Sequence, residues 1–187
     1  MKIPIEISAR HIHLSEKDYE KLFGKNSKMS VLFKISQPGQ FATKETLTIS
    51  NKDRKIENVR IVGPPRKQSY AELSLTDARK LKMKIPVRVS KSDLKGTPKV
   101  SVSNGNKKIK ISAIVAKRHL HLSEEQAKKL KLKDKQIIKI KVKGERGLVF
   151  DNVIVRAGDG NWLAFQIDTD EGNAAGISGK MFGEIVK

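Results

Sequence analysis

The chain has 187 residues and is strongly basic, with 39 Lys and Arg residues against 20 Asp and Glu residues and a formal net charge of +19. It contains no cysteine, which excludes disulfides, thiolate-bound metals and a cysteine nucleophile, and which is compatible with a reducing compartment. No apolar run approaches the roughly 20 residues of a membrane-spanning helix, and the first residues lack the apolar segment of a secretion signal. We therefore expect a soluble protein with no membrane partner.

The positive charge has two explanations. One is a polyanionic partner, such as nucleic acid, an anionic membrane surface or a phosphate-rich small molecule. The other is a lysine-rich composition spread over solvated faces. At 136–143 lysines alternate with apolar residues, as on the outer face of a strand, where they also protect sheet edges. Aromatic residues make up only 5% and do not cluster among basic ones, so we expect no nucleic-acid partner.

Short strands dominate the predicted elements. Helices are predicted at 15–22, 75–82, 123–131 and 170–175, and the Asn-Gly-Asn sequence at 104–106 predicts a hairpin turn. Many short strands with few helices indicate small barrels or sandwiches. In chain order, the predicted strands are 2–8, 45–50, 56–62, 98–103, 108–116, 136–143, 148–156 and 162–168.

Two copies of one phrase contain all four histidines. Residues 9–18 read ARHIHLSEKD, and residues 117–126 read KRHLHLSEEQ. On a strand, His-x-His places both imidazoles on one face, about 6–7 Å apart at Cα, where both can reach one metal ion or one anion. The serine after each phrase predicts the capped start of a helix. Chance or packing explains one copy, but two copies in a shared frame favour metal binding and two similar halves whose sites face each other.

The segment VGPPRKQSYAELSLTDARKL at 62–81 is the second informative stretch. Its rigid turn delivers Arg66, whose planar guanidinium suits phosphate or carboxylate. Glu72 lies between apolar residues, and a buried carboxylate needs a cation or a metal. The alternatives are an ordinary surface charge for Arg66 and a water-facing strand residue for Glu72. PVRVSKSDL, at 86–94, adds another polar loop.

These phrases, with QPGQFATKETLTI at 37–49, GERGLVFDNVIVR at 144–156 and DTDEGNAAG at 168–176, occur in an order that closely resembles the phosphate propanoyltransferase (phosphotransacylase) family. The resemblance covers nearly the entire chain. It implies a mainly β fold of two small β-barrels capped by short helices, with the N-terminal strand joining the C-terminal barrel. One barrel would contain residues 1–9 and 117–187 and the other residues 10–116, with the site where they meet.

The resemblance also implies an enzyme that moves a short acyl group, acetyl or propanoyl, reversibly between coenzyme A and inorganic phosphate. It implies two metal ions, taken as zinc, and a homodimer. The first ion would be held by His11, His13 and Glu72, and the second by His119, His121 and the residue at position 166. The remaining implied roles are phosphate binding and catalysis by Arg66, phosphate binding by Ser90, and coenzyme A binding by Ser8, Arg60 and Asn173.

The chain departs from the family pattern at Gln166, where the resemblance expects a third histidine. A carboxamide oxygen is a neutral and weaker donor to zinc than imidazole. The second site would then bind weakly, bind another metal, recruit a water or stay empty. Two other functions remain as alternatives, a catalytically impaired relative that binds coenzyme A or a single metal, and a basic nucleic-acid-binding barrel. The first phrase begins close to the N-terminus, without a targeting extension, so we expect a cytoplasmic enzyme.

Overall fold

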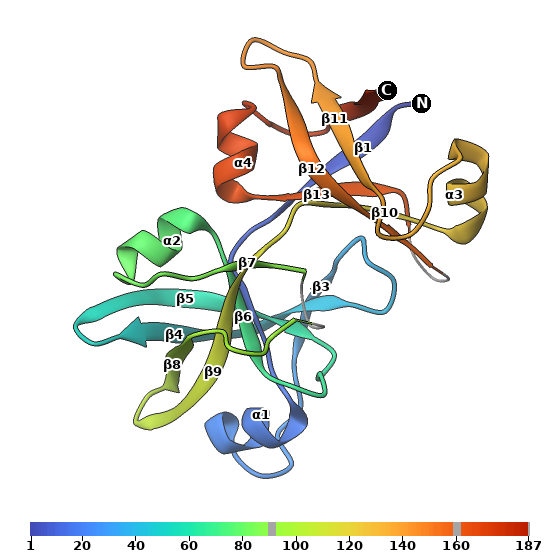
Figure 1. Cartoon of the computed structure of the whole chain (residues 1–187). Coiled ribbons are helices and arrows are strands. Elements are labelled where there is room, and N and C mark those ends of the chain that lie inside the picture. The colour runs from blue at the N-terminus through green and yellow to red at the C-terminus, as the bar shows by residue number, and fades with distance from the viewer. Residues whose placement is uncertain (90–92, 159–161, 187) are drawn as a thin grey trace. The chain divides into compact units, whose positions relative to one another are not determined.

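A computed structural model describes residues 1–89, 93–158 and 162–186, and the chain divides into two compact units (Figure 1). The terminal barrel joins Met1–Ala9 to Lys117–Lys187, and the central barrel comprises Arg10–Ala116. Each unit contains a closed ring of six strands with short helices. The predicted fold class, including the N-terminal strand in the C-terminal barrel, is therefore confirmed. No helix in the described ranges combines the length and apolarity needed to cross a membrane.

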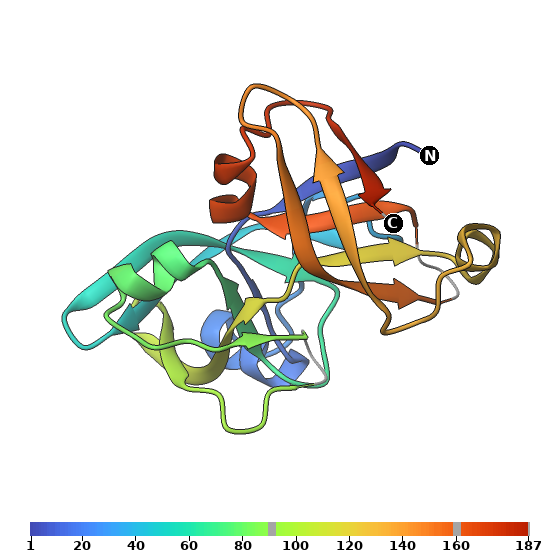
Figure 2. The same ribbon diagram turned by 45° about the horizontal axis from the view of Figure 1, so that its top comes forward.

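The terminal barrel has the strand order β1-β13-β10-β12-β11-β14, and β14 pairs with β1 to close it. Figure 2 shows β1, from the start of the chain, running beside β13, from near its end. Their pairing spans almost the whole sequence. The elements are β1 (Ile3–Ser8), β10 (His119–Leu122), α3 (Glu124–Leu130), β11 (Ile137–Val142), β12 (Leu148–Ala157), β13 (Ala164–Asp168), α4 (Thr169–Ala174) and β14 (Phe182–Val186).

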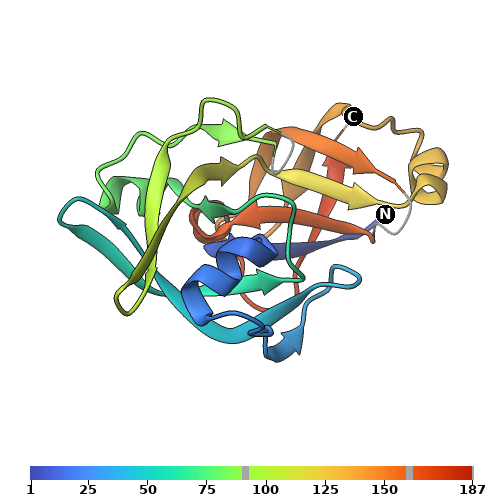
Figure 3. The same cartoon turned by 90° about the horizontal axis from the view of Figure 1, so that it is seen from below.

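The central barrel has the ring order β4-β5-β2-β6-β9-β8, closed because β8 pairs with both β9 and β4. β3 and β7 extend it through pairing with β4 and β9. Viewed from below, α1 lies over this barrel (Figure 3), where it contacts β8 and β9. The elements are β2 (His11–His13), α1 (Glu16–Phe23), β3 (Val31–Lys34), β4 (Phe41–Asn51), β5 (Arg54–Gly63), β6 (Tyr70–Leu73), α2 (Leu75–Lys80), β7 (Val87–Arg88), β8 (Lys99–Asn104) and β9 (Lys107–Ala116).

The two barrels share one pattern of strand pairing. β2 is parallel to β5 and antiparallel to β6, and β10 is likewise parallel to β12 and antiparallel to β13. β9 is parallel to β6, and β1 is parallel to β13. The chain is therefore an internal duplication with exchanged first strands. The strand before each histidine phrase completes the other copy's barrel.

The residue between each pair of histidines anchors its strand in a core. Ile12 is fully buried in the apolar cluster of the central barrel, and Leu120 is fully buried in that of the terminal barrel. Side chains alternate along a strand, so the histidines on either side project to the opposite face. Core packing therefore fixes the direction of both imidazole pairs.

Replacement of Leu120 by alanine should lower the free energy of unfolding by about 2–5 kcal/mol, because it leaves a cavity in a closed core. Urea unfolding followed by circular dichroism measures this loss. Val149→Ala in the same barrel is the control, since Val149 is 48% exposed and its truncation should change stability by about 0.5 kcal/mol or less. Equal losses in the two variants would contradict the anchoring role of Leu120.

Candidate functional site

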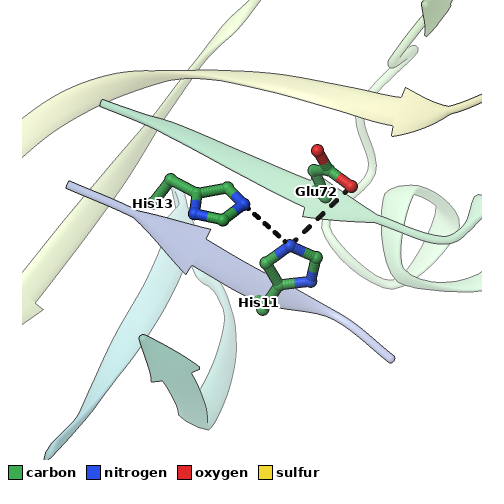
Figure 4. Close-up of side chains that lie close together, drawn as sticks. All are labelled: His11, His13 and Glu72. Carbon is green, nitrogen blue, oxygen red and sulfur yellow. Dashed lines mark hydrogen bonds and ion pairs between the residues drawn. The ribbon is translucent and has the colours of Figure 1, made fainter. Parts of the chain in front are cut away.

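The central barrel brings His11, His13 and Glu72 together. His11 and Glu72 are register partners across β2 and β6, so their side chains share a face. The Nε2 atoms of the two histidines lie 3.1 Å apart, and Glu72 Oε2 lies 3.7 Å from His11 Nε2 (Figure 4). All three ligand atoms lie within 4.8 Å of one another. One small cation could therefore contact all of them.

The hydrogen bond of His13 prepares its Nε2 as a ligand. His13 Nδ1 lies 3.0 Å from the carbonyl oxygen of Val62, which can only accept, so Nδ1 carries the proton and Nε2 keeps its lone pair. Two nitrogens on one tetrahedral zinc ion would be about 3.3–3.4 Å apart, close to the observed spacing. With an adjacent carboxylate, this donor set fits zinc. Metal-bound histidines characteristically donate their second ring nitrogen to a carbonyl in this way.

Arg66 reaches the same place from the turn after β5. Its Nε lies 3.4 Å from His13 Nδ1, its Nη2 donates to Gln40 Oε1, and its backbone amide donates to Leu14 O at 2.8 Å. The turn begins at Gly63, where an added Cβ would lie 2.6 Å from the Phe41 ring. Arg66 is thus held beside the histidine pair, where its guanidinium could bind an anion next to a cation.

The terminal barrel repeats the histidine pair on β10. The Nε2 atoms of His119 and His121 lie 3.0 Å apart, and His119 Nδ1 donates to the carbonyl of Lys117 at 2.8 Å. This bond leaves the lone pair of His119 on Nε2, as in the central barrel. Arg156 Nη1 lies 3.4 Å from that nitrogen, and the Trp162 ring stacks on His121 with centroids 4.4 Å apart. Each pair therefore has one arginine and one aromatic ring in contact, Arg66 and Tyr70 in the central barrel and Arg156 and Trp162 in the terminal barrel.

Gln166 lies beside the second pair as Glu72 lies beside the first. It is the register partner of His119 across β10 and β13, as Glu72 is of His11 across β2 and β6. Its Nε2 donates to Glu6 Oε2 at 3.1 Å. Within the described ranges, only the central pair forms a cluster of three His or acidic ligands. The second pair has a carboxamide in the position of the carboxylate.

The arginines before the histidine phrases form matching ion pairs. Arg10 Nε lies 2.8 Å from Asp77 Oδ1, and Arg118 Nε lies 2.6 Å from Glu171 Oε1. Asp77 and Glu171 each also complete a capping box at the start of a helix, α2 and α4 respectively. Each ion pair ties the start of a histidine strand to the helix that follows the neighbouring strand.

The remaining predicted residues lie in different surroundings. Arg60 is the register partner of His11, but its guanidinium donates to the carbonyls of Thr43 and Lys44. Ser8 ends β1 in the terminal barrel, and Asn173 is exposed on α4. Ser90 lies outside the described residues. The roles assigned to these residues remain predictions.

Four residues near the histidine pairs, Gln40, Arg156, Glu6 and Trp162, were not predicted as site residues from the sequence. Gln40, just before β4, accepts from Arg66, and Arg156 on β12 reaches His119. Trp162, just before β13, donates to Glu6 on the neighbouring β1. The position of Glu6 could have been inferred from strand alternation. It shares strand parity with Ser8, on the face opposite the core isoleucines of β1. A carboxylate there faces the same side as Gln166, its register partner.

Comparisons with known proteins point to one family. A model of the phosphate propanoyltransferase family matches residues 4–178. Proteins named phosphate propanoyltransferase from Clostridioides difficile, Thermotoga maritima and Enterococcus faecalis are similar to the chain. The first is 41% identical over 187 residues, covering 99% of this chain and 89% of the relative. The second is 44% identical over 176 residues (92% and 83%), and the third is 41% identical over 185 residues (98% and 87%).

The chain therefore belongs to the phosphate propanoyltransferase family. The resemblance predicted from the ordered phrases is confirmed, and so is the prediction of an acyltransferase enzyme.

Replacement of Arg118 by methionine should destabilise the terminal barrel more at pH 7.5 than at pH 4.5. Burial raises the pKa of Glu171 above its ordinary 4.5, although Arg118 opposes this shift. The folded chain then binds this proton more tightly than the unfolded chain, so stability falls as pH rises from 4.5 through the raised pKa. Without Arg118 that fall is larger. We expect a loss of about 1.5–3 kcal/mol at pH 7.5, measured by urea unfolding.

The double variant R118M/E171Q should recover most of that stability, because glutamine retains the capping position without a charge to neutralise. Gln126 fills the same position at the start of α3. A loss that is independent of pH, or that persists in the double variant, would show that packing of Arg118 over Phe150 dominates instead.

Proposed function

We propose that the chain is a phosphate acyltransferase that moves a short acyl group between coenzyme A and inorganic phosphate. The observation that carries the proposal is the position of Arg66, 3.4 Å from a histidine of the His11-His13-Glu72 cluster. This arrangement offers a cation site and an anion-binding guanidinium side by side, as attack of phosphate on a polarised thioester requires. Membership of the phosphate propanoyltransferase family supports the assignment.

The chemistry is a direct displacement. An oxygen of phosphate forms a bond to the acyl carbon, the carbon–sulfur bond breaks, and the thiolate of coenzyme A takes up the proton that phosphate loses. The chain has no cysteine that could carry a covalent acyl group. A zinc ion held by the cluster would supply a Lewis acid for the negative charge that develops on the thioester oxygen or the departing sulfur.

The residues around the cluster have separate roles. Arg66 binds and orients phosphate and offsets its charge, and Gln40 holds the guanidinium in place. Glu72 serves as a ligand that balances the charge of the cation, and it is not the general base. The carbonyl of Val62 accepts from His13 Nδ1 and so leaves the lone pair of His13 on Nε2. We further propose that the His119-His121 pair provides a second cation site for the same reaction.

Other features of the enzyme stay predictions. Zinc as the metal, coenzyme A contacts from Ser8, Arg60 and Asn173, a phosphate contact from Ser90, a homodimer and a cytoplasmic location are all part of this proposal. The choice between acetyl and propanoyl groups depends on the shape of the acyl pocket, where one methylene is worth only about 1–3 kcal/mol.

Replacement of Arg66 by alanine should raise the KM for phosphate by about tenfold or more, because a charge-assisted bond to the substrate is lost. The KM for acyl-CoA and the metal content should stay near wild type, since no predicted metal ligand changes. The assay is release of free thiol from acetyl-CoA and propanoyl-CoA at varied phosphate. Arg54→Ala, an exposed arginine of the same barrel, is the control. Unchanged phosphate saturation in R66A would contradict the assignment.

One observation favours a second candidate, an impaired relative that binds a single metal without turnover: Gln166 replaces the expected histidine. The metal content of protein purified without chelator, measured with activity on the same sample, separates the two functions. We expect nearly two metal ions per chain and acyl transfer. About one ion per chain without activity would favour the impaired relative.

A further inference from the structure

The internal duplication assigns a counterpart to each residue near the second histidine pair. Glu6 stands five residues before His11, as Ile114 stands five residues before His119. Glu6 is the register partner of Gln166 across β1 and β13, and Ile114 is the register partner of Glu72 across β9 and β6. The carboxylate therefore stands at different positions in the two barrels.

The carboxylate of the terminal barrel lies one strand further from the histidines. In the central barrel, the strand next to the histidines carries Glu72, and the strand beyond it carries the apolar Ile114. In the terminal barrel, the adjacent strand carries Gln166, and the strand beyond it carries Glu6. Each histidine pair thus has a glutamate in register with its first histidine, on the same face of the sheet. In the central barrel this carboxylate lies on the strand next to the histidines. In the terminal barrel it lies one strand further out, with the amide of Gln166 between it and the histidines.

The hydrogen bond between Gln166 and Glu6 fixes the orientation of that amide. An ionised carboxylate can only accept, so the atom of Gln166 that faces Glu6 Oε2 at 3.1 Å is the NH2 group. β1 and β10 flank β13 on opposite sides. Because the amide nitrogen of Gln166 points toward β1, its oxygen is directed to the other side, toward His119.

Trp162 holds Glu6 from a second direction. Its Nε1 donates to Glu6 Oε1 at 3.2 Å, and its ring stacks on His121. One oxygen of Glu6 accepts from Gln166, the register partner of His119, and the other accepts from Trp162, which stacks on His121. The carboxylate cannot turn without breaking one of these bonds.

We propose that Glu6 is a positioning residue of a second cation centre, which it completes by turning the oxygen of Gln166 toward His119 and His121. The proposal rests on the proposed function for the existence of that centre. Glu6 supplies through the amide the negative charge that Glu72 supplies directly in the central barrel. The ligand is a divalent cation that accepts two imidazole nitrogens and one neutral oxygen.

The test is titration of the chelator-treated full chain with Co²⁺, followed by visible absorption and equilibrium dialysis. A background with His11→Ala and His13→Ala removes the first centre, so that only the second one is titrated. In this background, Glu6→Ile, which copies Ile114, should weaken Co²⁺ binding about 10–100-fold, the usual loss when a ligand's support is removed. Adding Gln166→Glu reproduces the arrangement of the central barrel and should restore binding.

Glu184→Ala is the matched control, since Glu184 is paired with Lys143 on the same barrel. Circular dichroism checks folding, and if Glu6→Ile does not fold, Glu6→Gln, which keeps an acceptor for Trp162, makes the same comparison. Unchanged Co²⁺ affinity in a folded Glu6 variant overturns the proposal, as does a folded double variant without recovery or a background that binds no Co²⁺. Failure of the proposed function would appear separately, as wild-type protein that shows the expected Co²⁺ pattern but transfers no acyl group.

Discussion

The alternation of side chains along β2 and β10 is the constraint on which the rest of the structure depends. Ile12 and Leu120 are fully buried in the two cores, so the flanking histidines have a single face available. A backbone carbonyl then fixes the tautomer of one histidine in each pair and leaves its Nε2 directed at its neighbour. Core packing and two backbone hydrogen bonds thus prepare both pairs to act as ligands, before any substrate arrives.

The ion pairs behind the histidines extend this constraint to the helices. Each arginine holds an acidic residue that also caps a helix, so the start of a histidine strand and the end of its neighbour are tied to one carboxylate. This explains why arginine and serine accompany the histidines in the repeated phrase. Arginine secures the strand on one side, and serine begins the helix on the other. The repeated phrase therefore contains the residues that hold the histidine strand in place as well as the histidines themselves.

Much of the fold could be predicted from local sequence, because alternation and turn residues mark each long strand and helix. The exposed β3 and the two-residue β7 have too few alternating positions to be recognised, and β3, β7 and β14 were all missed. The residues of the central site could be proposed from the sequence because His11, His13 and Glu72 each stand in a distinctive phrase. The contact of Glu6 with Gln166 was not, since it joins residues 160 positions apart and depends on the parallel pairing of β1 with β13. The sequence showed that Gln166 replaces an expected histidine, but it did not show that Glu6 contacts this glutamine.

The exchange of first strands also orders the assembly of the protein during synthesis. All strands of the central barrel lie within Arg10–Ala116, so this segment is complete before β13 and β14 are made. β1 is made before any of it, yet its partners β13 and β14 are among the last strands of the chain. A central barrel that closes before β13 and β14 are made therefore leaves β1 without its partner strands. Glu6 lies in β1, so the terminal barrel acquires this carboxylate only when β1 pairs with β13.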